Sequence, residues 1–163
     1  MSKKLELVSK LEAIVGKLNV LTNGEIFEEF SKSTMKEQTH PCAVIIPSNK
    51  HDVLEIVKLF NDFNSQGNEK FQLHPISSGK NWGYTCSEAG CDNAFLLYLV
   101  NLNSITEYDD TLGTVRIGTG VTQKQLYEFL KEKGLKFWMD ATGSSVDCSV
   151  LSNSLERGFG HTP

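Results

Sequence analysis

The stretch PISSGKNWGY, residues Pro75–Tyr84, decides the fold of this 163-residue chain. An apolar segment precedes it, and its glycines, serines and asparagine favour turns, so we expect a loop at the end of a buried strand. Proteins built from alternating strands and helices bind ligands at the carboxyl ends of their strands. The loop is therefore the first candidate for a binding site.

The composition of this loop is typical of an anion-binding turn. Its two glycines let the backbone adopt positive φ and approach a ligand closely. Successive backbone N–H groups in such a turn form a concave site for anions. The side chains of Ser77, Ser78 and Asn81 add donors, and Lys80 adds a charge that could offset a phosphate. Ordinary surface turns have the same composition, so composition alone leaves both interpretations open.

A strand–helix–strand unit leads into the loop. The run Cys42–Ile46 is short and apolar, which predicts a buried strand that Pro47 ends. Ser48 is the expected cap of the next helix. One buried stripe is predicted on that helix: Val53, Ile56, Val57 and Phe60. The segment Phe71–Ile76 is the second strand, and this order of elements implies a parallel crossover.

Before this unit, apolar residues at helical spacing predict a helix within residues 3–18, and a shorter helix is expected within 24–31. After the loop, the apolar run over 94–102 predicts another buried strand. The segments 105–108 and 114–118 flank a turn and predict a β-hairpin.

The hairpin is followed by a helix with clear end signals. Thr122 with Gln125 three residues later forms a capping-box pattern, and Gly134 is the expected end of the helix. Gly118-Thr119-Gly120 precedes it and faintly resembles a dinucleotide-binding fingerprint. The third glycine of that fingerprint is missing, because position 123 is glutamine, so we assign the two glycines to a strand-to-helix turn.

A second polar stretch, residues 140–160, is rich in Gly, Ser, Thr, Asp and Asn. It can wrap a cofactor with backbone and hydroxyl groups, or it can be a polar loop followed by a short helix over 151–156. It contains no nucleophile elbow of the Gly-x-Ser-x-Gly type. The four histidines are scattered without metal-ligand spacing, so we expect no metal site.

Bulk properties exclude some classes of protein. The net charge of −4 argues against nucleic-acid binding, which usually requires a basic face. No apolar stretch approaches the roughly 20 residues needed to span a bilayer. We expect a cytoplasmic protein whose four cysteines are reduced and structural.

Two motifs resemble those of a known family. Pro75–Tyr84 is similar to the pattern Pro-[Ile/Val]-Ser-x-Gly-[Arg/Lys]-Asn-x-Gly-Tyr. Val150–Pro163 is similar to Val-x-Gly-Asn-x-x-[Glu/Asp]-Arg-Gly-x-Gly-Tyr-Thr-Pro. Both patterns belong to the vanillyl-alcohol oxidase and p-cresol methylhydroxylase (PCMH) flavoproteins, and the similarity runs from about Met35 to the end of the chain. Ser152 replaces the usual glycine of the second motif and His161 its usual tyrosine.

The resemblance implies an α+β fold: a two-lobed, PCMH-type FAD-binding domain. It would have a small parallel β-α-β lobe and an incomplete second lobe of mixed or antiparallel strands. Residues 1–34 would form an N-terminal helical segment and residues 35–163 the FAD-binding domain. The first lobe would extend to about Ala89. Because the chain stops within a glycine-rich motif, we expect the second lobe to be truncated and the substrate (cap) domain to be absent.

The resemblance also implies a cofactor site for FAD. The pyrophosphate would lie on the first loop, and the second polar stretch would approach the flavin or the adenosine. The implied cofactor-binding residues are Ser77, Ser78, Gly79, Lys80, Asn81, Trp82, Gly83, Tyr84, Gly143, Ser144, Ser145, Ser149, Ser152, Asn153 and Gly158. Related oxidases with covalent flavin often carry a histidine where Asn81 stands, so we expect no histidyl–flavin bond from this loop.

The implied function is that of the FAD-binding portion of a flavin-dependent oxidoreductase. The whole enzyme would oxidise an alcohol, a phenol or a hydroxy acid by hydride transfer to FAD. We assign no catalytic residue within this chain, and a small-molecule substrate is expected only for a complete enzyme. The alternative is a non-catalytic remnant, or a subunit completed by a partner chain or by a second copy, that binds FAD weakly or not at all. A nucleotide-sugar reductase with the same FAD fold also stays open.

Overall fold

The first lobe is built on a four-stranded sheet with the order β1-β2-β4-β3. The computed structural model describes residues 2–30, 39–66, 69–80, 89–134, 136–137, 139, 141 and 145–155. The strands are β1 (Val20–Leu21), β2 (Ala43–Ile45), β3 (Gln72–Ile76) and β4 (Ala94–Tyr98). β2, β4 and β3 are parallel, and β1 pairs antiparallel with β2 at one edge.

The central strand β4 is apolar because both of its faces are covered. Phe95 and Leu97 point into one hydrophobic cluster, whereas Ala94 and Leu96 point into a second cluster on the opposite face. This alternation is the period of two that every strand has. Parallel strands buried on both faces read as continuous apolar runs, and this is the pattern that predicted the strand.

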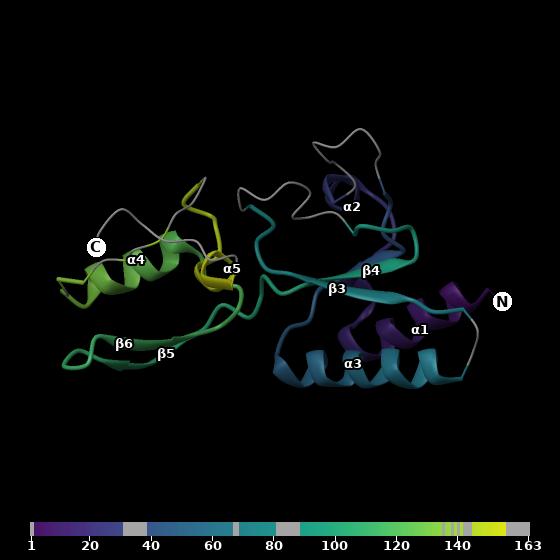
Figure 1. The fold of residues 1–163 in the computed structure, drawn as a ribbon, viewed down its shortest axis with the longest axis horizontal. Coiled ribbons are helices and arrows are strands. Elements are labelled where there is room, and N and C mark those ends of the chain that lie inside the picture. Colours follow the sequence, from purple (N-terminus) through teal and green to yellow (C-terminus); the bar gives the residue numbers. More distant parts are fainter. Residues whose placement is uncertain are drawn as a thin grey trace.

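Helices cover both faces of this sheet (Figure 1). Helices α1 (Lys3–Val15) and α3 (Lys50–Ser65) lie on one face, and α2 (Glu25–Glu29) lies on the other. A 3-10 turn, Lys17–Asn19, joins α1 to β1. Of the segment predicted over 1–34, the described residues 2–30 therefore share the core of the first lobe, and they add an edge strand that the sequence pattern did not indicate.

Two details of α3 differ from the sequence prediction. Its cap is Asn49 rather than Ser48, because the Asn49 side chain accepts hydrogen bonds from the backbone N–H groups of His51 and Asp52. Val57 is 39% exposed, whereas Ile56 and Phe60 are buried as predicted. The buried stripe is thus narrower than the apolar spacing indicated.

The predicted boundary between the lobes is wrong. We expected the first lobe to end near Ala89, but β4 lies between β2 and β3 and belongs to the first sheet. The chain passes to the second lobe only after Tyr98. An apolar run shows that a strand is buried but not which sheet buries it, so the sequence pattern could not place β4.

The second lobe contains a hairpin and two helices. β5 (Ile105–Asp109) and β6 (Thr114–Ile117) pair antiparallel, and α4 (Gln123–Glu132) and α5 (Val150–Leu155) follow. The predicted capping box of Thr122 and Gln125 is present at the start of α4. The inner face of α4 packs on the hairpin through a cluster centred on Val121, Leu126 and Leu130.

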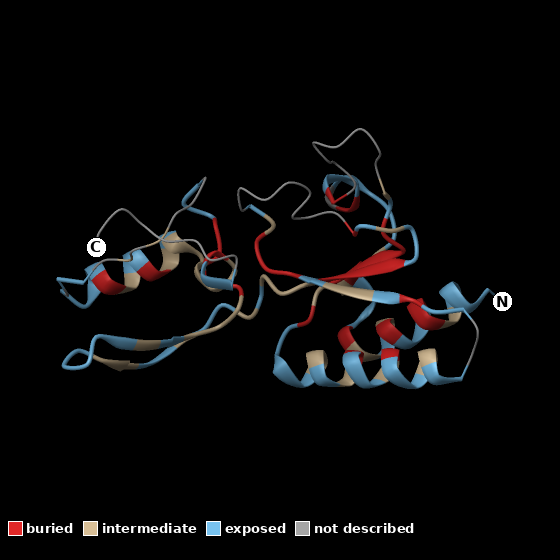
Figure 2. Ribbon diagram, viewed as in Figure 1, coloured by how far each residue is buried: buried red, intermediate tan, exposed pale blue. Residues whose placement is uncertain are grey.

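Burial differs between the lobes. Figure 2 shows the sheet of the first lobe almost entirely buried at its centre, whereas the hairpin of the second lobe is exposed or half-buried. The α+β, two-lobed fold class predicted from the sequence is confirmed, with one mixed sheet, parallel except for its β1 edge, and one antiparallel sheet. Within the described residues, no helix is both long and apolar enough to cross a membrane.

Candidate functional site

The candidate loop follows directly from two paired strands. Ile76 at the end of β3 lies opposite Tyr98 at the end of β4, and the pairing continues where the Leu99 N–H donates to the Ile76 carbonyl at 2.9 Å. Residues 77–80 leave the sheet at this point. The chain also leaves β4 here on its way to the second lobe, so the loop lies at the junction of the lobes (Figure 1).

Ser77 and Ser78 are polar residues that the junction buries. Their exposed fractions are 8% and 9%. The Ser77 hydroxyl donates to the carbonyl of Thr119, and the backbone N–H of Ser149 donates to Ser78 Oγ at 3.0 Å. Buried polar groups are expected to be hydrogen-bonded, and here both partners come from the second lobe.

The next two residues change the direction of the backbone. Gly79 has φ +65°, a conformation that side chains with a Cβ rarely adopt. The Lys80 side chain is exposed, while its backbone carbonyl accepts a hydrogen bond from the Cys148 thiol at 3.0 Å. A left-handed residue that follows turn-forming serines is the kind of backbone that forms an anion-binding nest.

Thr119 belongs to the turn between β6 and α4, where two glycines permit a close backbone approach. A Cβ on Gly118 would lie 2.0 Å from the Leu102 carbonyl oxygen, and one on Gly120 would lie 2.5 Å from the Val100 carbonyl oxygen. Only glycine fits at both positions. These glycines serve a strand-to-helix turn, as predicted, and they also press that turn against the chain leaving β4.

Ser149 is fully buried, and it makes several of the hydrogen bonds at the junction of the lobes. Its hydroxyl donates to the Thr119 carbonyl at 3.1 Å and accepts the N–H of Ser152 at 3.2 Å. The second bond satisfies one of the backbone donors at the start of α5, as an N-cap does. A bridge between Thr122 and Ser149 holds this segment beside the turn.

The structure thus joins some of the predicted site residues. Ser78 and Lys80 contact the segment that contains Ser149, and Ser77 shares the Thr119 carbonyl with Ser149. Ser152 joins them through Ser149. Asn153 is buried in α5, while Ser145 is exposed and accepts the N–H of Asp147. The other predicted site residues lie outside the described part of the chain: Asn81, Trp82, Gly83, Tyr84, Gly143, Ser144 and Gly158.

Two contributors were missed from the sequence. Thr119 contributes its backbone carbonyl, and Cys148 contributes a thiol whose partner is 68 residues earlier in the chain. The sequence did hold one signal for Thr119, because flanking glycines mark a close backbone approach. Nothing in the local pattern distinguished Cys148 from an ordinary buried thiol.

Tyr98, at the end of β4 beside the junction, is a half-buried phenol. Burial raises the pKa of Tyr98, and the nearby Glu29 carboxylate adds to this effect, so the phenol stays protonated at neutral pH. Tyr98 packs edge-on against Phe30 with ring centroids 5.0 Å apart. In the described part of the chain, no group of three or more His, Cys, Asp or Glu could hold a metal ion.

Comparison with known proteins agrees with this geometry. Residues 41–162 match the family model described as FAD binding domain. The chain is 35% identical over 118 residues to 1'-carboxy-chondrochloren decarboxylase of Chondromyces crocatus. The aligned region covers 72% of this chain and 21% of that protein. It is 26% identical to the 4-cresol dehydrogenase [hydroxylating] flavoprotein subunit of Pseudomonas putida, over 96% of this chain and 29% of the relative.

Solved structures show the same fold. The structure of p-cresol methylhydroxylase with substrate bound matches 96% of this chain and 30% of its own with a TM-score of 0.86 at 23% identity. The 4-ethylphenol oxidase of Gulosibacter chungangensis matches 99% of this chain and 30% of its own with a TM-score of 0.86 at 26% identity. The chain therefore spans less than a third of the length of these relatives.

Proposed function

Because the chain belongs to the FAD-binding domain family, we propose that it is the cofactor-binding part of an enzyme that oxidises an alcohol, phenol or hydroxy acid by hydride transfer to FAD. FAD is the cofactor of this family and of its flavoprotein relatives, as the two sequence motifs implied. The substrate class and the vanillyl-alcohol oxidase branch are parts of the proposal.

One observation carries the proposal: the position and conformation of residues 77–80. The loop begins where two parallel strands end, turns through a left-handed glycine, and lies between two lobes. These features suit a doubly negative pyrophosphate, because backbone N–H groups converge in such turns and the Lys80 side chain adds positive charge. The residues present therefore fit the cofactor that the family implies.

In this proposal the protein binds and orients, while the cofactor accepts the hydride. The backbone of Ser77–Lys80 would hold the pyrophosphate, and the Ser78 hydroxyl would donate to one of its oxygens. Ser145, Ser152 and Asn153 would line the rest of the cofactor from the second lobe. The described residues supply no group that we assign as a catalytic base.

The substrate part of the proposal rests on the names of relatives. One is a 4-cresol dehydrogenase and another is a D-2-hydroxyglutarate dehydrogenase, which 26% identity links to 85% of this chain. These names cover a phenol and a hydroxy acid. A third relative is named a decarboxylase, so the names of the relatives do not point to a single reaction. For this reason the cofactor should be tested before any substrate.

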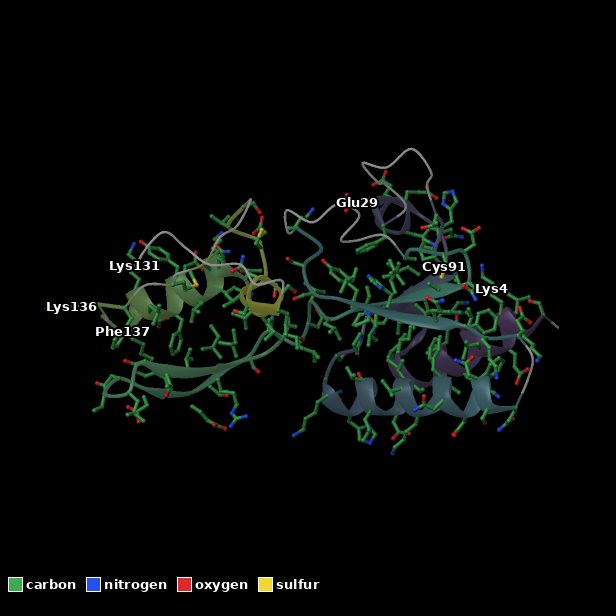
Figure 3. The ribbon with its side chains drawn as sticks, viewed as in Figure 1. Lys4, Glu29, Cys91, Lys131, Lys136 and Phe137 are labelled. Atoms are coloured by element: carbon green, nitrogen blue, oxygen red, sulfur yellow. The ribbon has the colours of Figure 1, made fainter. Side chains whose placement is uncertain are left out.

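A second candidate is a subunit completed by another chain or by a second copy. A small apolar pocket of about 100 Å³ opens between the hairpin and α4, lined by Tyr108, Gly113, Thr114, Val115, Leu126, Leu130, Phe137 and Met139. Figure 3 labels Phe137 at this end of the lobe, where the ring lies against the hairpin turn at Gly113 and is 47% exposed. A second chain that covered this ring and filled the pocket would bury apolar surface, which is favourable.

The test is to add FAD to the purified chain, remove the excess, and record a visible spectrum with a size-exclusion profile. We expect flavin to elute with the protein. Flavin retained only in a larger species would support the completed subunit. A folded chain that retains no flavin in any species would support the non-catalytic remnant and contradict the proposed function.

A further inference from the structure

The serines of the junction form a closed circuit of hydrogen bonds. The Thr119 carbonyl accepts the hydroxyl of Ser77 from the first lobe and the hydroxyl of Ser149 from the second lobe, the latter at 3.1 Å. The Ser149 N–H then donates to Ser78 Oγ at 3.0 Å. Ser77 and Ser78 are adjacent, so three separate chain segments are tied together. The Cys148 thiol adds a further bond between the loop and the second lobe by donating to the Lys80 carbonyl.

Counting hydrogens separates the roles of these serines. A serine hydroxyl has one hydrogen to donate and two lone pairs that accept. The hydrogens of Ser77 and Ser149 are both directed at the Thr119 carbonyl, so neither remains for a phosphate oxygen. Ser78 Oγ accepts from Ser149, and within the described part of the chain its own hydrogen is not committed.

The acceptor at the centre of the circuit is held rigidly. Thr119 stands between two glycines whose backbone lies against the chain that leaves β4, and Gly120 N–H donates to the Leu102 carbonyl at 2.8 Å. The carbonyl therefore has a fixed place relative to the ends of β3 and β4. Hydroxyls that bind it fix the loop before any ligand arrives, and such preorganisation reduces the ordering cost of binding.

We infer that Ser77 and Ser149 are positioning residues that clamp the loop to the second lobe through the Thr119 carbonyl, leaving Ser78 as the serine that donates to the bound phosphate. This inference rests on the proposed FAD site and reassigns two residues that the sequence grouped with the cofactor contacts. In this inference, the turn between β6 and α4 supplies the Thr119 carbonyl, which both hydroxyls share as their acceptor.

The decisive readout is the hydrogen exchange of the Ser149 amide in the protein without FAD. This N–H is buried and bonded to Ser78 Oγ, so it reports whether the clamp is closed. We expect Ser77→Ala to accelerate its exchange about tenfold, because one of the two hydroxyls on the Thr119 carbonyl is lost, and to weaken FAD binding several-fold. A residue that only contacted phosphate would leave this amide unchanged in the absence of FAD.

Two further variants complete the experiment. Ser78→Ala removes both the acceptor for Ser149 and the free donor, so it should lose more FAD affinity than Ser77→Ala for a similar rise in exchange. Ser65→Ala is the matched control, because the exposed Ser65 hydroxyl donates to the Asp62 carbonyl at the end of α3, away from the junction. It should change neither measurement.

The outcomes are separable from those of the proposed function. Amides of β4 serve as an internal reference, and unchanged protection there shows that each variant is folded. Fast exchange of the Ser149 amide in Ser77→Ala supports the clamp even if the parent chain binds no FAD. Unchanged exchange in a folded Ser77→Ala would overturn the clamp, and weaker FAD binding in that case would make Ser77 a direct ligand.

Discussion

Replacing Gly79 by valine is the most informative single change in the loop. Gly79 has φ +65°, which an L-residue with a Cβ reaches only with strain. The left-handed conformation costs about 1–2 kcal/mol for a residue with a side chain. If the loop relaxes in the free protein and must be restored to bind FAD, this cost appears as a loss of roughly 5- to 30-fold in affinity.

The control for this change is Gly134→Val at the end of α4. Gly134 has φ +68°, so the same substitution imposes the same kind of strain. A Cβ at Gly134 would meet no atom within 4 Å, and the residue lies outside the candidate site. We therefore expect Gly134→Val to lower the free energy of unfolding but to leave the Kd for FAD within about twofold of the parent value.

The assay is a titration of each purified variant with FAD, followed by flavin fluorescence, beside a urea unfolding curve. Weaker binding by Gly79→Val than by Gly134→Val at similar loss of stability would support the loop assignment. Equal Kd values for Gly79→Val and the parent chain, with both folded, would refute the reasoning that this turn carries the pyrophosphate.

Three further substitutions test the fold around the site. Gly118→Ala should destabilise the chain by about 1–3 kcal/mol in urea unfolding, because its Cβ would collide with the Leu102 carbonyl, and an unchanged midpoint would contradict that contact. Asn49→Ala should cost about 1 kcal/mol by removing the cap of α3. Ser48→Ala should be nearly neutral, and the reverse order would show that Ser48 is the cap after all.

Much of the fold was predictable because its signals are local. The strand–helix–strand unit and the hairpin follow from apolar periodicity and turn residues, and the capping box of Thr122 and Gln125 is a pattern four residues long. The two-residue strand β1 was missed because alternation needs more residues to be visible. The position of β4 was missed because its apolar sequence predicts burial on both faces but does not show which strands pair with it.

The location of the site was predictable from the sequence, but the hydrogen bonds that hold it were not. The composition of the loop and its position after β3 pointed to residues 77–80, and the structure puts them at the lobe junction. The hydrogen bonds that hold them join residues 42 to 71 positions apart in the chain. Two of them end on a backbone carbonyl, and residue type does not reveal the partners of a carbonyl. The structure was therefore needed to tell which serines position the loop and which serine is left to donate to a phosphate.

The central claim is that residues 77–80 bind the pyrophosphate of FAD, and the most direct test is a visible spectrum of the chain after FAD is added and the excess is removed. The account predicts that the parent chain and Gly134→Val retain flavin and that Gly79→Val retains much less. A folded parent chain that elutes without flavin, or a Gly79→Val variant that retains as much as the parent, would contradict it.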